Sequence, residues 1–165
     1  MATTKAKTQA KTKAQAVSKG KISKPAAKTS AAQKAGAKLA LVGKALPEFE
    51  LPATGEKVIS SKVLQGKKVV LFFYPKDSTP GCTIEGQDFT RLHDKFKAAG
   101  AEVFGVSRDS LKSHEKFKTN QKYSIDLLSD EDESVCNLFG VIKMKNMYGR
   151  QVRGIERSTF IIDAN

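Results

Sequence analysis

The longest apolar run in the chain is Val69–Tyr74, which is rich in β-branched and aromatic residues. Six residues are too few for an independent helix and are typical of a strand buried on both faces of a sheet. We therefore predict a strand at 68–75. Shorter apolar runs predict three more strands, at 102–106, 125–128 and 158–163.

Helices are predicted between these strands. Segment 83–100 has apolar residues at spacings of three and four, namely Phe89, Leu92, Phe96 and Ala99. Gly100 stands where such a helix would end, and similar patterns predict helices at 110–121 and 133–139. Upstream, 54–56 indicates a turn between two short strands. Alternating strands and helices predict an α/β fold with a mixed, mostly parallel sheet and helices on both faces.

The first 46 residues have a different composition, with 13 Ala, 11 Lys and neither acidic nor aromatic residues. Such a segment cannot bury enough apolar surface to offset the entropy of ordering. We expect 1–44 to be a disordered basic tail resembling those of histone H1, and 45–165 to be the folded domain. The chain stops just after a predicted strand, so this domain is expected to lack a C-terminal strand and helix.

The formal net charge of +12 comes from the tail, because the chain beyond residue 47 has 18 basic and 17 acidic residues. Two interpretations of the tail stay open. It is either a solvated segment that aids solubility or remains from targeting, or a segment that contacts nucleic acid without sequence preference and releases it in salt.

Several classes of protein are excluded by the sequence. No apolar run approaches the ~20 residues of a membrane span, and no secretory signal pattern follows the first lysines. The two cysteines, Cys82 and Cys136, cannot make a disulfide scaffold, and they have no histidine at metal-ligand spacing. We expect a reducing, cytoplasmic compartment, with association to the nucleoid if the tail binds DNA.

The candidate chemistry lies between the first predicted strand and the first predicted helix. Cys82 follows Pro80-Gly81 and begins that helix. Unpaired backbone N–H groups and the positive end of the helix dipole favour a thiolate there, which would make the sulfur nucleophilic. The alternative is an inert, buried cysteine.

The residues around Cys82 resemble the peroxiredoxin signature, Pro75-x-x-x-Thr79-x-x-Cys82. The longer string 73–85 is similar to the peroxiredoxin Q subgroup, also called bacterioferritin comigratory protein. Later segments resemble the same subgroup in the same order, at 106–110, 127–130, 148–150 and 154–161. The resemblance covers about 43–165. It implies a thioredoxin-like fold and a thioredoxin-dependent peroxidase that reduces hydrogen peroxide and organic hydroperoxides in antioxidant defence.

The resemblance also implies roles for individual residues. Cys82 would be the peroxidatic cysteine, Thr79 the hydroxyl that binds thiolate and peroxide, and Arg157 the cation that fixes both. The substrate pocket would include Pro75, Pro80, Gly81 and Glu85. Glu85 either orients Arg157 or only complements the helix dipole. No metal or organic cofactor is implied.

Recycling of the oxidised sulfur is a separate question. Many relatives have a resolving cysteine five residues after the peroxidatic one, where this chain has Gln87, and others have it in a stretch aligned with 113–118, which contains no cysteine. Cys136 is the remaining candidate, but its apolar neighbours favour an inert core residue. We expect a one-cysteine cycle in a monomer, with thioredoxin, glutaredoxin or glutathione as reductant.

Other classes and residues have weaker support. A thioredoxin-type disulfide oxidoreductase needs Cys-x-x-Cys, and residue 85 is Glu; a nucleoid-associated binding protein would use only the tail. His93 and His114 are interpreted as surface residues. Met144, Met147 and Tyr148 are expected in a loop, where they either line the rim of the site or cap the core.

Overall fold

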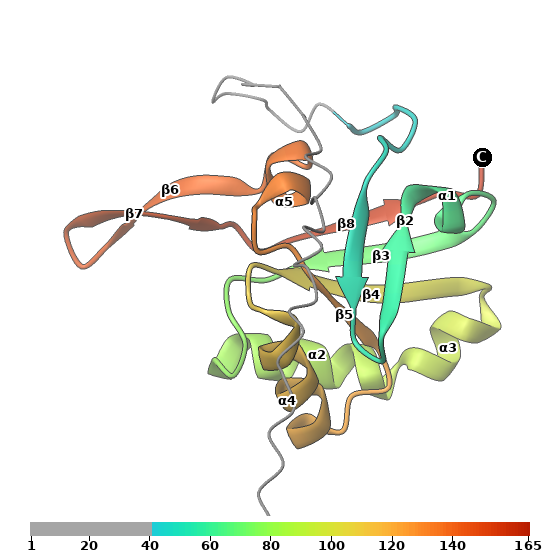
Figure 1. Cartoon of the computed structure of the whole chain (residues 1–165), viewed down its shortest axis with the longest axis horizontal. Helices are drawn as coiled ribbons and strands as arrows, with labels where there is room; N and C mark the ends of the chain where they lie inside the picture. Colours follow the sequence, from blue (N-terminus) through green and yellow to red (C-terminus); the bar gives the residue numbers. More distant parts are fainter. Residues whose placement is uncertain (1–40) are drawn as a thin grey trace, which may run out of the picture. The chain divides into compact units, whose positions relative to one another are not determined.

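The computed structural model describes residues 41–165, which form the cartoon drawn in colour in Figure 1. The predicted basic tail at 1–44 lies almost wholly outside the described residues and stays a prediction. Within the described part, no helix is long and apolar enough to cross a membrane.

A six-stranded sheet forms the centre of the described part, in the order β2-β1-β5-β4-β3-β8. Its strands are β1 Glu50–Ala53, β2 Lys57–Ser60, β3 Lys68–Phe73, β4 Ala101–Ser107, β5 Asp126–Ser129 and β8 Ser158–Ile162. The three central strands β3, β4 and β5 run parallel, and the outer pairings are antiparallel (Figure 1). The predicted mixed α/β sheet is confirmed, with its parallel part confined to the centre.

Five helices connect these strands: α1 Ser61–Leu64, α2 Pro80–Arg91, α3 His93–Ala98, α4 Leu111–Gln121 and α5 Ser134–Leu138. The prediction of one helix at 83–100 is wrong in two respects. The helix starts earlier because proline fits the first helical position, and it breaks at Leu92, where φ is −94° and ψ is 0°. Phe89 and Phe96 nevertheless pack together from the two pieces, with ring centroids 5.9 Å apart.

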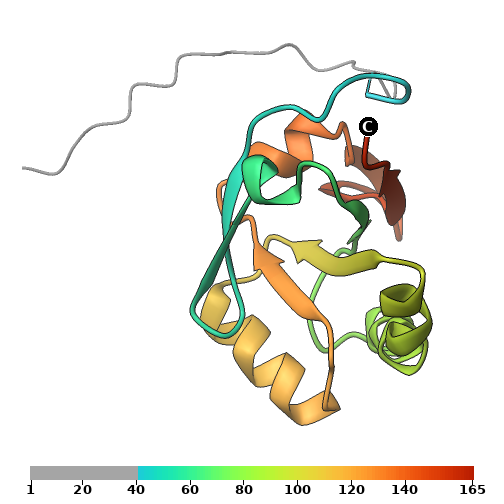
Figure 2. The same cartoon turned by 90° about the vertical axis from the view of Figure 1, so that its right-hand side faces the viewer.

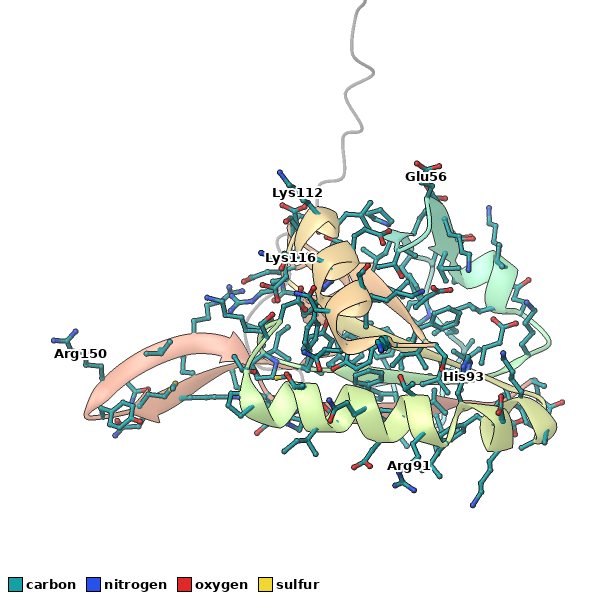
Figure 3. All side chains as sticks on the ribbon, turned by 90° about the horizontal axis from the view of Figure 1, so that it is seen from below. Glu56, Arg91, His93, Lys112, Lys116 and Arg150 are labelled. Carbon is teal, nitrogen blue, oxygen red and sulfur yellow. The ribbon has the colours of Figure 1, made fainter. Side chains whose placement is uncertain are left out.

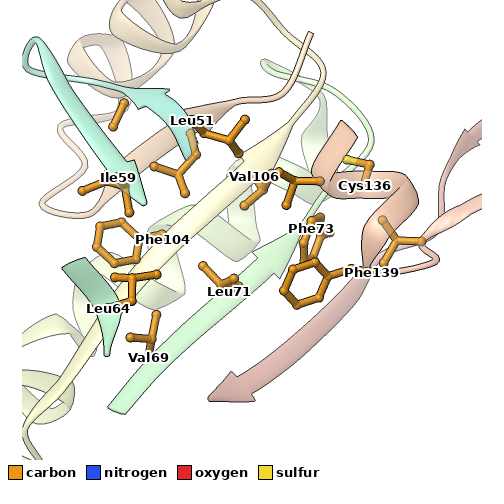
Figure 4. Close-up of a cluster of buried hydrophobic side chains, with 14 of the residues drawn as sticks. Leu51, Ile59, Leu64, Val69, Leu71, Phe73, Phe104, Val106, Cys136 and Phe139 are labelled. Carbon is orange, nitrogen blue, oxygen red and sulfur yellow. The ribbon is translucent and has the colours of Figure 1, made fainter. Parts of the chain in front are cut away.

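Side chains of β3 alternate between two hydrophobic clusters, one on each face of the sheet. Val69, Leu71 and Phe73 join the cluster that contains α1 and α5 side chains (Figure 4). Val70 and Phe72 join the cluster that contains α2 and α4 side chains. Figure 2 shows α1 and α5 above the sheet and α2, α3 and α4 below it. Helices on both faces are therefore confirmed.

Residues 142–155 form a hairpin of β6 Ile142–Met147 and β7 Arg150–Ile155, so the prediction of a loop here is wrong. Tyr148 and Gly149 both have positive φ, as two-residue hairpin turns require. The hairpin projects from the sheet, with Arg150 near its tip (Figure 3). Three of its apolar side chains are half or more exposed and cap no core: Met144, Met147 and Tyr148.

Gly105 lies in β4 where its neighbours leave no room for a side chain. A Cβ atom there would lie 2.7 Å from Phe72 Cζ and 2.8 Å from Leu127 Cδ2. We expect Gly105→Ala to lower the free energy of unfolding by about 1–3 kcal/mol in urea denaturation, because overpacking forces the core to shift. Gly154→Ala is the control, since its methyl group would meet only Arg108, at 3.9 Å. Equal losses in both variants would contradict the expectation.

Candidate active site

The turn after β3 delivers Cys82 to the start of α2. Thr79 has extended backbone angles and precedes Pro80, the first helical residue, so Cys82 is the third residue of the helix. The first intrahelical bond runs from the Thr83 N–H to the Thr79 carbonyl, at 2.9 Å. The N–H groups of Gly81 and Cys82 come before it and have no acceptor within the helix. The sulfur therefore lies beside unpaired donors and the positive end of the helix dipole.

Arg157 reaches the same sulfur from 75 positions further along the chain. Its Nη2 atom lies 3.2 Å from Cys82 Sγ. The strand register explains this approach: β8 runs antiparallel to β3 with Ser158 opposite Phe73, so Arg157 lies beside the point where the chain leaves β3. Gly81 allows the approach as well, because a Cβ atom on it would already lie 3.4 Å from Nη2. Cys82 is only 3% exposed.

Glu85 completes a charged group around the sulfur. Its carboxylate pairs with Nη1 of Arg157, while Nη2 faces Cys82. Burial raises the pKa of Glu85, although the charge of Arg157 opposes this. The pKa of Arg157 is also raised, because its bonds to Cys82 and the Glu85 charge outweigh the burial of the guanidinium. The guanidinium thus stays charged and is oriented from two sides.

The remaining residues of the predicted pocket lie in the same turn. The Thr79 hydroxyl donates to the Lys76 carbonyl at 3.0 Å, and Thr79 accepts a hydrogen bond from the Thr83 hydroxyl at its own carbonyl. Pro75 is half-buried and Pro80 exposed. A short, hydrogen-bonded turn therefore leads from Lys76 to Cys82. Among the described residues, no group of three His, Cys, Asp or Glu could hold a metal ion.

Cys136 lies on the other face of the sheet. It is fully buried in the cluster with Phe73 and Phe139 (Figure 4), whereas Cys82 belongs to the cluster between the sheet and helices α2 and α4. Burial raises the pKa of the Cys136 thiol, and the nearby Asp130 carboxylate raises it further. Gln87, which lies five residues after Cys82 at one of the positions considered for a resolving cysteine, forms a hydrogen bond with Gln121 at 3.0 Å. The two cysteines cannot meet without a rearrangement of the sheet or of its helices.

Sequence reasoning missed the polar cluster behind the turn. His114 was interpreted as a surface residue, but it is fully buried, and its Nδ1 atom lies 2.9 Å from the Asp77 carboxylate. A usable signal was present: His114 and Phe117 are three residues apart and so share the apolar face of α4. His93 has a different setting, partly exposed and 2.7 Å from the Ser124 hydroxyl.

Comparison with known proteins shows the family of this chain. The sequence profile described as the AhpC/TSA family matches residues 42–165. The chain belongs to the AhpC/TSA family. Peroxiredoxin Bcp of Xanthomonas campestris is 53% identical over 116 residues, which cover 69% of this chain and 72% of that protein. Peroxiredoxin Bcp of Bacillus subtilis is 41% identical over 122 residues, or 74% of this chain and 78% of that protein.

Solved structures of AhpC/TSA proteins show the same fold. Xanthomonas campestris peroxiredoxin Q has a TM-score of 0.67 at 51% identity, covering 70% of this chain and 73% of that chain. Mycobacterium tuberculosis BcpB has a TM-score of 0.64 at 34% identity, covering 73% and 77%. The thioredoxin-like fold and the peroxiredoxin Q subgroup are thereby confirmed, and this member of the family is a cysteine-based peroxidase.

The raised pKa of Glu85 gives a test of how the charged group affects stability. A carboxyl whose pKa is raised by folding disfavours the folded state when it is ionised, so we expect Glu85→Gln to be at least as stable as the wild type near pH 7. As the pH falls through the raised pKa, the wild-type side chain takes up a proton and the difference should close. Urea denaturation near pH 7 and pH 4 measures both.

The control for this variant is Glu48→Gln, because the Glu48 side chain is 86% exposed. Its stability should follow that of the wild type at both pH values. A Glu85→Gln variant that is clearly less stable than the wild type near pH 7 would show that the pair with Arg157 stabilises the fold.

Proposed function

We propose that Cys82 is the peroxidatic cysteine of this peroxidase and that Arg157 is its main electrostatic partner. The observation that carries the proposal is the 3.2 Å contact between Arg157 Nη2 and Cys82 Sγ. In the reaction, the thiolate attacks one oxygen of a hydroperoxide. An S–O bond forms as the O–O bond breaks, the attacked oxygen stays with its hydrogen on sulfur as the sulfenic acid, and the other oxygen leaves and takes up a proton from solvent as water or an alcohol.

The charge that moves during this step needs fixed donors. Negative charge passes from sulfur to the leaving oxygen, and preorganised donors stabilise such charge without rearranging. The Arg157 guanidinium and the N–H groups of Gly81 and Cys82, which have no acceptor within the helix, are proposed as these donors. Thr79 is proposed to turn its hydroxyl from the Lys76 carbonyl toward the bound peroxide.

Hydrogen peroxide and organic hydroperoxides are the proposed substrates. The support is that the proposed residues act on the sulfur and on the O–O group, which all hydroperoxides share. One of the similar Xanthomonas campestris structures is described by its alkyl peroxide reduction activity, at 50% identity to this chain. Pro75 and Pro80 are proposed to limit access to the sulfenic acid and so to slow further oxidation.

We propose that an external thiol recycles the enzyme. The thiol attacks the sulfenic acid, releases water and leaves a mixed disulfide on Cys82, and a second thiol then releases Cys82 as a thiolate. This one-cysteine cycle is supported by the separation of Cys82 and Cys136 into different clusters. Thioredoxin, glutaredoxin and glutathione are the proposed reductants.

Three finer assignments belong to the proposal and depend on the sequence alone. The enzyme is proposed to be a monomer in a reducing, cytoplasmic compartment. The lysine-rich tail, with no acidic residue, is proposed to bring it into weak, salt-sensitive contact with nucleic acid.

Removing the guanidinium tests the electrostatic role. We expect Arg157→Ala to lower the second-order rate constant of Cys82 with hydrogen peroxide by about 100-fold or more, as loss of one preorganised donor does in other enzymes. Stopped-flow measurement of peroxide consumption gives this rate. Arg153→Ala is the matched control, because Arg153 is another exposed arginine, in β7, and pairs with Glu133 instead. Similar losses in both variants would refute the assignment.

Mass spectrometry tests the one-cysteine cycle. After one equivalent of peroxide and a sulfenic-acid trap such as dimedone, we expect the adduct on Cys82 alone, both in the wild type and in Cys136→Ser. The physical reason is that the Cys136 thiol is buried, un-ionised and on the opposite face of the sheet. A mass loss of two hydrogens, with Cys82 and Cys136 linked in one peptide pair, would overturn the proposal.

A further inference from the structure

The turn between β3 and α2, residues 74–79, is here called the catalytic turn. Asp77 lies in the middle of it and points inward. It is 6% exposed, while its neighbours Lys76 and Ser78 are exposed. The Tyr74 and Ser113 hydroxyls donate to its carboxylate, each at 2.7 Å, and His114 Nδ1 lies 2.9 Å from it. Asp77 is therefore the inward anchor of the turn that carries Thr79 and leads to Cys82.

These contacts join the turn to four parts of the sheet and its helices. Tyr74 follows β3, and Ser113 and His114 belong to α4. The backbone N–H of Asp77 donates to Asp109 Oδ2, after β4, at 2.9 Å. His114 Nε2 lies 3.1 Å from the Leu128 carbonyl of β5. Apart from Tyr74, the groups that contact Asp77 directly are 32 to 37 positions further along the chain.

The backbone of the turn needs such support. Ser78 has φ +58°, a left-handed conformation that residues other than glycine rarely adopt. Strained backbone of this kind persists where the surroundings determine it. Asp77, immediately before Ser78, supplies both a side-chain and a backbone hydrogen bond that hold this conformation.

The partners of His114 suit a doubly protonated ring. Leu128 presents a carbonyl oxygen, which only accepts hydrogen bonds, and Asp77 presents a carboxylate. An imidazolium, with an N–H group on each nitrogen, would satisfy both acceptors. Burial raises the pKa of Asp77, but this effect is outweighed by the hydrogen bond and charge of His114 and by the hydrogen bonds from Ser113 and Tyr74, so the pKa is lowered.

The other groups that face this pair leave the assignment unchanged. Burial and the Asp77 charge raise the pKa of Tyr74 well above its ordinary value, so its phenol stays neutral and donates. Asp109 is the other carboxylate at the cluster in the described chain, and its Oδ2 accepts from the Ser107 hydroxyl and from the Asp77 N–H. His114 is the only basic side chain in hydrogen-bond contact with Asp77 among residues 41–165.

We propose that Asp77 and His114 form a buried ion pair that positions the peroxidatic turn, with Asp77 as the positioning residue and His114 as its counter-ion. The inference depends on the proposed role of Cys82. The Asp77–His114 pair holds Ser78 and Thr79 so that the Thr79 hydroxyl and the start of α2 face the bound peroxide. Neither residue touches the reacting atoms.

The protonation state of His114 can be tested without any activity. We expect a ¹⁵N-correlated spectrum of the wild-type imidazole groups near pH 7 to show N–H protons on both ring nitrogens of one histidine. That signal should vanish in His114→Asn and persist in His93→Asn, which assigns it. A neutral tautomer at His114 would overturn the ion pair, whatever the enzyme does with peroxide.

The positioning role is tested by comparing two reactions of Cys82. We expect Asp77→Asn and His114→Asn to slow the reaction with hydrogen peroxide by about 10- to 100-fold, because small misplacements of catalytic groups have effects of this size. Alkylation of Cys82 by iodoacetamide needs no pocket and should change by less than about threefold. His93→Asn, the matched histidine control, should change neither rate.

The outcomes separate this inference from the proposed function. Wild-type peroxide rates in Asp77→Asn and His114→Asn, or equal losses in both reactions, would refute positioning. If Asp77→Asn does not fold, His114→Asn and the wild-type spectrum still decide. Failure of wild-type Cys82 to react with peroxide would instead refute the proposed function and leave the ion pair to be judged by the spectrum.

Discussion

The pairing of β8 with β3 is the constraint on which the site depends. It places Arg157, from the far end of the chain, beside the point where β3 ends and the catalytic turn begins. The same point precedes the start of α2, where the N–H groups of Gly81 and Cys82 have no acceptor within the helix. Neither segment forms the proposed site alone, because the helix start supplies the sulfur and partial charges, while the guanidinium comes from the residue just before β8.

The site keeps its charges at some cost to the fold. Burial raises the pKa of Glu85, whose carboxylate pairs with the same guanidinium that faces the sulfur. Behind the turn, the Asp77 carboxylate is buried with His114. A buried ion pair is weak evidence for stability, since desolvation offsets much of the attraction. Its presence close to Cys82 fits the proposed positioning role, because attack on an O–O bond requires the sulfur and the peroxide to be closely aligned.

The sheet also separates the two cysteines. The alternation of side chains along the strands creates two clusters that do not mix, with Cys82 in one and Cys136 in the other. Cys82 contacts Arg157, whereas Cys136 packs among Phe73 and Phe139 beside Asp130. The two cysteines therefore have different surroundings because they occupy opposite faces of one sheet.

Local patterns in the sequence predict most of the strands and helices. The apolar run at 69–74, the helix at 110–121 and the thiol at a helix start all depend on neighbours within about four residues, which periodicity records. The break at Leu92 and the β6–β7 hairpin were missed because they depend on backbone angles that apolar spacing does not encode.

The family signature also assigns Cys82, Thr79 and Arg157 from the sequence alone. What only the tertiary structure decided is how distant residues meet: the contact of Arg157 with Cys82, the opposite faces of the two cysteines, and the burial of His114 against Asp77. These depend on strand order and register, which bring together side chains 37 to 75 positions apart. Local sequence specifies each partner, but the sheet specifies the pairing.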